Sequence, residues 1–460
     1  RRRAYLRAVC PTLFDAFDTD DLYLRKQDKI YYGEKMVQIT KLDNGLTLVT
    51  GSYPSFRSVA AGFWVGAGSA FESDAENGIS HFTEHVMYKG TAELSAARIA
   101  ERFEDLGASF NAFTSKEATC FYFKSIDEKF GDCFALLSHI LYESLFDDAE
   151  LDKERKVIAE EIHMVEDEPE EICYDLLAGR RYEGTRLANT ILGPVDNVMR
   201  FRGDDVREYT RRMYTPDNIV ISMVGNIRHE DALKLVEKYV LPRCGCGRCA
   251  KEFPENVEGG GYAEYKKDFE QVNLAIGFPS VPFDDDLTAV QSVVSFCFGT
   301  GMSSRLFQRL REQQGLVYNV YTSCSTYKRN GNFGIYVNTS GGNLGKAVSS
   351  VAEEIKILVR DGLTAAELER AKMQLKSSML FGIENILSVM SSCGKYALYT
   401  GKAYDIDKSI AQVENVTLGD VADFCRSGVF DRPVSVAYVG KKQFVEGKDI
   451  YSDLLSGLRA

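Results

Sequence analysis

The run NIVISMVG, residues 218–225, returns 215 positions further on as PVSVAYVG, residues 433–440. Both runs are apolar, rich in β-branched residues and closed by Gly, which is typical of a buried strand followed by a turn. Two further pairs keep the same order at offsets of 215 and 217: AAGF at 60–63 with AIGF at 275–278, and AELDKERK from Ala149 with AELERAK from Ala366. Three ordered pairs predict an internal duplication of a unit about 200 residues long, a normal domain size.

Each half shows the same succession of patterns. ASFNAFTSKEATCFYFKSI, residues 108–126, alternates and is rich in Phe, Thr and Tyr, as strands are. Ile99, Phe103 and Leu106 keep helical spacing after Ser95, a good N-cap. The second half repeats this order with a strand in GNFGIYVNTS and a helix in LGKAVSSVAEEIKILVRDG. We therefore predict an α+β protein of two homologous α/β-sandwich domains, each an antiparallel-rich sheet with helices packed on one face.

The domain boundaries follow from composition. Residues 1–35 are expected to be an N-terminal extension, because Met36 opens the first strand-like segment. The halves are predicted at 36–240 and 265–460, joined by a linker at 241–264 that is rich in Gly, Cys and charge. The three linker cysteines, Cys244, Cys246 and Cys249, are a weak candidate metal site without a fourth ligand nearby.

Composition excludes several classes of protein. The chain of 460 residues is 45% hydrophobic and 27% charged, as soluble globular proteins are. Its net charge of −12 argues against nonspecific binding to nucleic acid, and we find no apolar run of ~18 residues that would span a membrane. The eleven cysteines are mostly isolated among apolar residues, as in reduced cytosolic proteins, so a cytoplasmic location is expected.

Two of the five histidines lie in GISHFTEHVMYKG, around an acid: His81, Glu84 and His85. On a helix over about 78–88, positions i, i+3 and i+4 share one face, so both imidazoles could bind one metal ion. Glu84 would then lie where it could take a proton from a zinc-bound water. The alternative is two surface histidines with a solvated glutamate.

A catalytic zinc needs a third protein ligand. The acidic helix predicted in LDKERKVIAEEIHMVEDE, from Leu151, offers candidates. Glu161 and Glu154 are seven positions apart and share a face, whereas Glu160 points about 100° away from Glu161. Spacing does not choose between Glu160 and Glu161, and a solvated acidic helix is the alternative interpretation.

These segments resemble a known family. HFTEHVMYKGT carries the H-x-x-E-H signature of the inverzincins, and ERKVIAEEIHMVEDEPEE resembles the segment with their third ligand. Over roughly 36–455 the chain resembles the pitrilysin-type metallopeptidases, in particular the mitochondrial processing peptidase β subunit and its bacterial relatives. The resemblance implies that His81, His85 and Glu161 bind zinc, that Glu84 activates the water and that Glu154 is an accessory acid.

The resemblance also implies substrate-binding residues. Asn111 and Ala112, in SFNAFTS, match the edge strand that pairs with the substrate backbone. Arg311 and Tyr318, in GTGMSSRLFQRLREQQGLVYNVYTS, match a pair that would reach from the second half to the active site, where Tyr318 could donate a hydrogen bond to the substrate carbonyl or its developing oxyanion. An ordinary helix followed by a strand is the alternative for this segment.

We expect one zinc ion per chain. All five histidines lie at or before His229, and the offset of 215 carries His81 and His85 onto Phe296 and Thr300. The resulting hypothesis is a zinc endopeptidase that acts on peptides or unfolded segments in a closable chamber, as a homodimer that binds neither nucleic acid nor membrane. The alternatives are a non-catalytic peptide-binding subunit and an organellar processing peptidase of the mitochondrial matrix, which residues 1–35 do not favour because acidic residues follow too soon.

Overall fold

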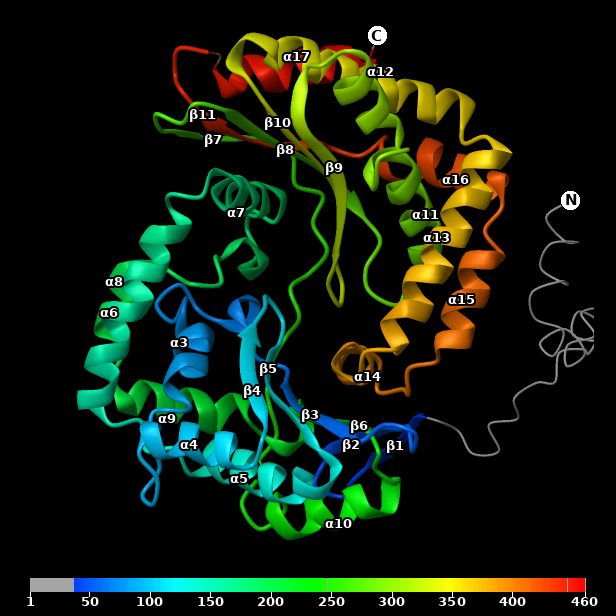
Figure 1. Cartoon of the computed structure of the whole chain (residues 1–460). Helices are drawn as coiled ribbons and strands as arrows, with labels where there is room; N and C mark the ends of the chain where they lie inside the picture. Colours follow the sequence, from blue (N-terminus) through cyan, green and yellow to red (C-terminus); the bar gives the residue numbers. More distant parts are fainter. Residues whose placement is uncertain (1–36, 246, 445, 460) are drawn as a thin grey trace, which may run out of the picture. The chain divides into compact units, whose positions relative to one another are not determined.

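The computed structural model describes residues 37–245, 247–444 and 446–459, and the predicted extension, 1–35, lies outside them. The strands form two mixed sheets (Figure 1). The first sheet has the order β1-β2-β6-β3-β5-β4, and its strands are β1 (Val37–Lys41), β2 (Thr47–Ser52), β3 (Ser58–Val65), β4 (Ser109–Thr114), β5 (Thr119–Ile126) and β6 (Ile219–Gly225). The second has the order β7-β11-β8-β10-β9, with β7 (Gly261–Lys266), β8 (Val272–Ser280), β9 (Val317–Thr326), β10 (Gly331–Thr339) and β11 (Ser435–Gly440).

The two sheets confirm the predicted duplication. The repeated runs form β6 and β11, which lie at equivalent places in their sheets, and every residue of both strands is buried. Each sheet contains one parallel pair, β2 with β6 and β7 with β11, among antiparallel neighbours. The α+β duplication predicted from three short repeats is therefore correct.

The helices also follow the same order in both halves. The first half contains α3 (Ile79–Val86), α4 (Ala96–Asp105), α5 (Phe130–Glu143), α6 (Asp148–Val165), α7 (Pro169–Arg181), α8 (Val195–Arg200), α9 (Gly203–Met213) and α10 (His229–Tyr239). The second contains α11 (Thr288–Gly299), α12 (Leu344–Asp361), α13 (Ala365–Ile383), α14 (Ile386–Thr400), α15 (Ile406–Glu414), α16 (Leu418–Phe424) and α17 (Gly447–Arg459). Short 3-10 turns are η2 (Ser69–Phe71), η3 (Asp127–Lys129), η4 (Arg186–Ala188), η5 (Pro216–Asn218) and η7 (Gly341–Asn343), and η6 (Phe307–Gln313) and η8 (Cys425–Val429) are π-helical.

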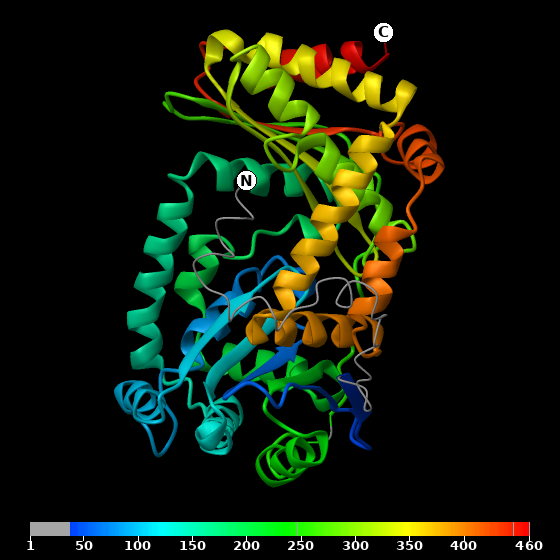
Figure 2. The same cartoon turned by 45° about the vertical axis from the view of Figure 1, so that its right-hand side comes forward.

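The sequence predicts helices on one face of each sheet, but both faces are covered. One face of each sheet packs against helices of its own half. The other face receives a helix from the opposite half: α14 packs on β2, β3 and β6, and α7 packs on β7, β8 and β11 (Figures 1 and 2). This exchange explains the nearly continuous apolar runs of β6 and β11, because a strand buried on both faces has no polar side.

Two glycines allow α14 to approach the first sheet closely. A Cβ on Gly394 would lie 2.2 Å from the Trp64 ring nitrogen, and a Cβ on Gly62 would lie 2.6 Å from the Met390 sulfur. Ser222, the polar residue within the run that forms β6, donates a hydrogen bond of 2.8 Å to the Met390 carbonyl. The first sheet is thus built to receive this helix.

The predicted linker, 241–264, extends too far in the C-terminal direction. Strand β7 begins at Gly261, so the last four residues of 241–264 pair with β11. The glycines before Tyr262 disguise the start of the strand, although Tyr262 and Tyr265 are good strand formers. None of the helices in the described ranges is both long and apolar enough to cross a membrane.

Candidate metal centre

Gly78 and Glu72 hold the first turn of helix α3 in place. Gly78, its N-cap, has a φ of 101°, and a Cβ there would lie 2.6 Å from the Leu192 carbonyl oxygen. The buried Glu72 carboxylate accepts hydrogen bonds from the Gly78 and Ser80 backbone N–H groups, at 2.8 and 2.7 Å. These bonds satisfy N–H groups that a helix start leaves unpaired, so the helix that carries the two histidines is held at its first turn.

Helix α6, which carries Glu154 and Glu161, lies next to α3. Asp147 caps it by accepting from the Ala149 N–H at 3.0 Å. Leu151, Ile158 and Ile162 are buried in the first core, and α6 packs against α3. The predicted helix in this acidic segment is therefore confirmed.

The structure brings together His81, His85 and Glu161 (Figure 1 shows α3 beside α6). The Glu161 Oε2 atom lies 3.7 Å from His81 Nε2 and 3.4 Å from His85 Nε2. Tetrahedral zinc with bonds of 2.0–2.1 Å needs ligand atoms about 3.3–3.4 Å apart, so two imidazole nitrogens and one carboxylate oxygen fit the ion. Within the described ranges no other set of three His, Cys, Asp or Glu residues could hold a metal. The geometry thus selects Glu161 over Glu160.

The two imidazoles differ in charge. Burial, and then the neighbouring His85, lower the pKa of His81 to about 4. Burial also opposes the charge on His85, but hydrogen bonds to Glu154 and Glu161 outweigh it and raise the pKa of His85 to about 9. His81 is therefore neutral at pH 7, as a metal ligand must be, whereas His85 gives up a proton when a metal binds.

Glu84 lies between the histidines in a partly buried environment. Burial raises the pKa of Glu84, and the Thr114 hydroxyl opposes this rise by donating a hydrogen bond of 2.5 Å to Glu84 Oε2. A carboxylate with a raised pKa suits a group that takes up and returns a proton near neutral pH. Thr114, the last residue of β4, was missed in the sequence because nothing in SFNAFTS marks its hydroxyl as a partner of Glu84.

Glu154 lies behind His85. His85 Nδ1 is 2.9 Å from Glu154 Oε1, which leaves His85 Nε2 to face Glu161. The second oxygen of Glu154 is 2.6 Å from Lys89 Nζ. The role of Glu154 as an accessory acid stays a prediction. Lys89 is absent from the predicted site, although it lies four positions after His85.

Asn111 and Ala112 lie on β4, the edge strand of the first sheet. Among the described strands β4 pairs with β5 alone, so its other edge is open to them, and an extended peptide can pair there. The Asn111 side-chain oxygen accepts a hydrogen bond of 2.8 Å from the Ala112 N–H.

Arg311 and Tyr318 lie on two successive elements of the second half, η6 and β9. Arg311 lies in η6, where its guanidinium stacks 4.9 Å over the Phe307 ring, and Tyr318, on β9, is 62% exposed. Across the described ranges neither side chain forms a hydrogen bond or ion pair with His81, Glu84 or His85. Their predicted role in substrate binding stays a prediction.

The linker cysteines do not converge on a metal site in the described part of the chain. Cys246 lies outside the described residues. Cys244 is buried and accepts a hydrogen bond from Asn44, whereas Cys249 contacts the Met213 sulfur at 4.0 Å.

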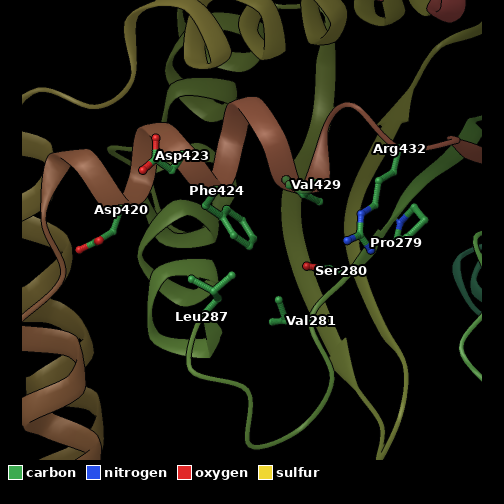
Figure 3. Close-up of a pocket in the computed structure, with 10 residues that line it drawn as sticks. Pro279, Ser280, Val281, Leu287, Asp420, Asp423, Phe424, Val429 and Arg432 are labelled. Atoms are coloured by element: carbon green, nitrogen blue, oxygen red, sulfur yellow. The ribbon is translucent and has the colours of Figure 1, made fainter.

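One cavity of about 310 Å³ lies in the second half, between the end of β8, α16 and η8. Figure 3 shows an apolar wall with Phe424 and Leu287, Arg432 at one end and Asp420 and Asp423 at the other. None of the predicted site residues lines it, so the cavity is separate from the metal centre.

Two family models match the chain in succession. The model described as Insulinase (Peptidase family M16) matches residues 47–195, and the model described as Peptidase M16 inactive domain matches residues 200–375. The chain is 39% identical over 393 residues to a Bacillus subtilis protein named Uncharacterized zinc protease YmxG, covering 85% of this chain and 95% of that protein. It is 32% identical to an uncharacterized zinc protease of Streptomyces coelicolor, covering 89% of this chain and 90% of the relative.

Solved structures share the fold. A structure titled peptidase M16 inactive domain from Pseudomonas fluorescens superposes with a TM-score of 0.83 at 19% identity, covering 88% of this chain and 98% of that chain. A structure titled a protease from Helicobacter pylori gives 0.81 at 19% identity, covering 88% and 99%.

A duplicated α+β sandwich with H-x-x-E-H on a helix of one half defines the class of inverzincin-type proteins. The chain belongs to peptidase family M16. The family resemblance drawn from residues 81–91 and from the acidic helix is thereby confirmed.

Proposed function

We propose that the chain is a zinc-dependent endopeptidase with one zinc ion held by His81, His85 and Glu161. The convergence of His81 Nε2 and His85 Nε2 on α3 with Glu161 Oε2 on α6 carries this proposal, and Glu84 shares α3 with the two histidines. The zinc protease names of relatives that align along nearly their whole length support the same activity.

The protein's own groups divide the chemistry. Zinc, when bound, supplies a Lewis acid and lowers the pKa of a water molecule from about 15.7 to near 7. Glu84 takes up a proton and returns it to the leaving amine, a task that its burial favours. Thr114 holds the Glu84 carboxylate, and Glu154 holds the His85 imidazole so that Nε2 faces the ion.

The substrate is an extended peptide or an unfolded segment that adds to the edge of β4. Main-chain hydrogen bonds to β4 around Asn111 and Ala112 hold such a strand near α3, which contacts β4. Arg311 and Tyr318 are assigned to the substrate carbonyl within a closable chamber, and a cytoplasmic homodimer is the proposed working form.

The first experiment compares metal content and cleavage. Wild-type protein is expected to contain about one zinc per chain and to cleave a quenched-fluorescence peptide until a chelator removes the metal. E84Q is expected to keep the zinc and lose turnover, because the change removes the base and spares the ligands. E160Q, on the exposed side of α6 next to Glu161, is the control and should behave as wild type.

Other outcomes separate the alternatives. Zinc without cleavage would support a non-catalytic or partner-dependent peptide-binding subunit. Wild-type cleavage by E84Q would refute the role of Glu84, and protein that takes up no zinc would refute the metal centre.

A further inference from the structure

We propose that Lys89 is a positioning residue for the metal centre, which acts on His85 through Glu154. This inference rests on the proposed function, because it assigns Lys89 a part in holding the zinc ligand. Lys89 has no place in the H-x-x-E-H signature, and its role emerges only from the contacts around Glu154.

The two oxygens of the Glu154 carboxylate contact two different residues. Its Oε1 atom is 2.9 Å from His85 Nδ1 and its Oε2 atom is 2.6 Å from Lys89 Nζ. Two anchors on two oxygens fix the plane of a carboxylate, whereas one anchor leaves it free to turn about its Cγ–Cδ bond. Lys89 thus sets the direction from which Glu154 holds the His85 imidazole.

Burial distinguishes this pair from an ordinary surface ion pair. The Glu154 side chain is only 9% exposed and that of Lys89 is 31% exposed. Exposed ion pairs contribute little because water competes with them, but a buried carboxylate needs its partners. Without Lys89, Glu154 would keep His85 as its sole charged partner among the described residues.

The backbone holds Lys89 in place. The chain turns after α3, where the Lys89 N–H donates to the Val86 carbonyl at 3.1 Å. The next residue, Gly90, accepts from the Leu145 N–H at 3.0 Å, which ties this turn to the segment before α6. Lys89 therefore reaches Glu154 from a fixed turn and joins the end of the histidine helix to α6.

Charge alone predicts the opposite effect from positioning. A lysine near a divalent cation repels it, so removal of the charge would strengthen zinc binding if electrostatics were its only contribution. Loss of positioning weakens zinc binding, typically by about 10- to 100-fold for a residue that orients a ligand. The sign of the change in zinc affinity therefore decides between the two.

The test measures zinc affinity by competition with a chromophoric chelator for wild type, K89M and K89R. We expect K89M to bind zinc about 10- to 100-fold more weakly, while the metal-free variant stays folded, as judged by its far-UV circular dichroism spectrum. K89R should keep most of the affinity, because a guanidinium also donates to a carboxylate.

The matched control is K153M. Lys153 lies on α6 next to Glu154 and also forms a 2.6 Å ion pair, with Glu150, but the two side chains are 70% and 37% exposed. K153M should bind zinc as wild type does. Unchanged or tighter binding by K89M would overturn the proposal while wild-type zinc binding still stands, whereas failure of wild type to bind zinc would refute the proposed function itself.

Discussion

The hydrogen bond from Thr114 to Glu84 gives the sharpest prediction about turnover. T114V replaces the hydroxyl with a methyl group of similar size and removes the 2.5 Å bond to Glu84 Oε2. A hydrogen bond to a charged group is worth about 1.5–3 kcal/mol, which corresponds to roughly a 10- to 150-fold loss in kcat if the bond acts in the transition state. Zinc content should not change, because Thr114 forms no contact with the three ligand residues among the described hydrogen bonds.

The pH dependence of T114V follows from the same bond. The Thr114 hydroxyl favours the ionised form of Glu84, whose pKa is already raised by burial. Its loss should raise that pKa further, so the acid limb of the pH–rate profile moves to higher pH. T114S, which keeps a hydroxyl, should recover most of the activity.

The assay is steady-state cleavage of a quenched peptide, with kcat and KM determined separately across the pH range. T83V is the control: Thr83 is the residue before Glu84, and its buried hydroxyl has no hydrogen-bond partner in the described structure. T114V with the kcat and acid limb of wild type would refute the assignment of Thr114 as the group that holds Glu84.

Two further predictions concern stability. M390A truncates a fully buried side chain of α14 that packs on the first sheet, and it should lower the free energy of unfolding, measured in urea, by about 2–5 kcal/mol. The control, M373A at an exposed position of α13, should change this free energy by less than about 0.5 kcal/mol. Equal effects of the two variants would contradict the packing described for α14. Burial opposes ionisation of Glu367, but hydrogen bonds from Arg305 and Thr364 outweigh it and lower its pKa to about 2. The stabilisation of the fold by ionised Glu367 is complete above the ordinary pKa near 4.5 and is lost as the pH falls towards 2. E367Q should therefore lower the free energy of unfolding, measured in urea, by about 1–2 kcal/mol at pH 7 and by almost nothing near pH 2. A loss that does not depend on pH would refute this account.

Local patterns predicted the elements that carry the candidate site. The spacing of His81, Glu84 and His85 indicates one helical face, and the i, i+7 relation of Glu154 and Glu161 places both on the side of α6 that faces α3. The relative directions of side chains on one helix are fixed by the helix geometry alone, so the sequence is enough to predict them. Spacing could not choose between Glu160 and Glu161, because the rotation of α6 about its axis depends on which of its residues pack into the core. In the structure these are Leu151, Ile158 and Ile162.

Contacts between distant segments were not predictable in the same way. The apolar sequence of α14 indicates a buried helix but not which sheet covers it, because that depends on the path of the chain between halves. Lys89 and Thr114 reach the site from a turn and from a strand end, where the sequence has no periodic signal. The start of β7 was missed because three glycines in succession resemble a loop.

The reciprocal placement of α7 and α14 has a consequence for the origin of the molecule. Each half gives one helix to the other and receives one in return at the equivalent strands, β11 and β6. Two identical ancestral subunits that traded this helix would form a domain-swapped pair with the same contacts. Joining their genes through a connecting segment would preserve every contact of that pair, and it would free one copy to lose the two histidines of the H-x-x-E-H helix while the other kept them.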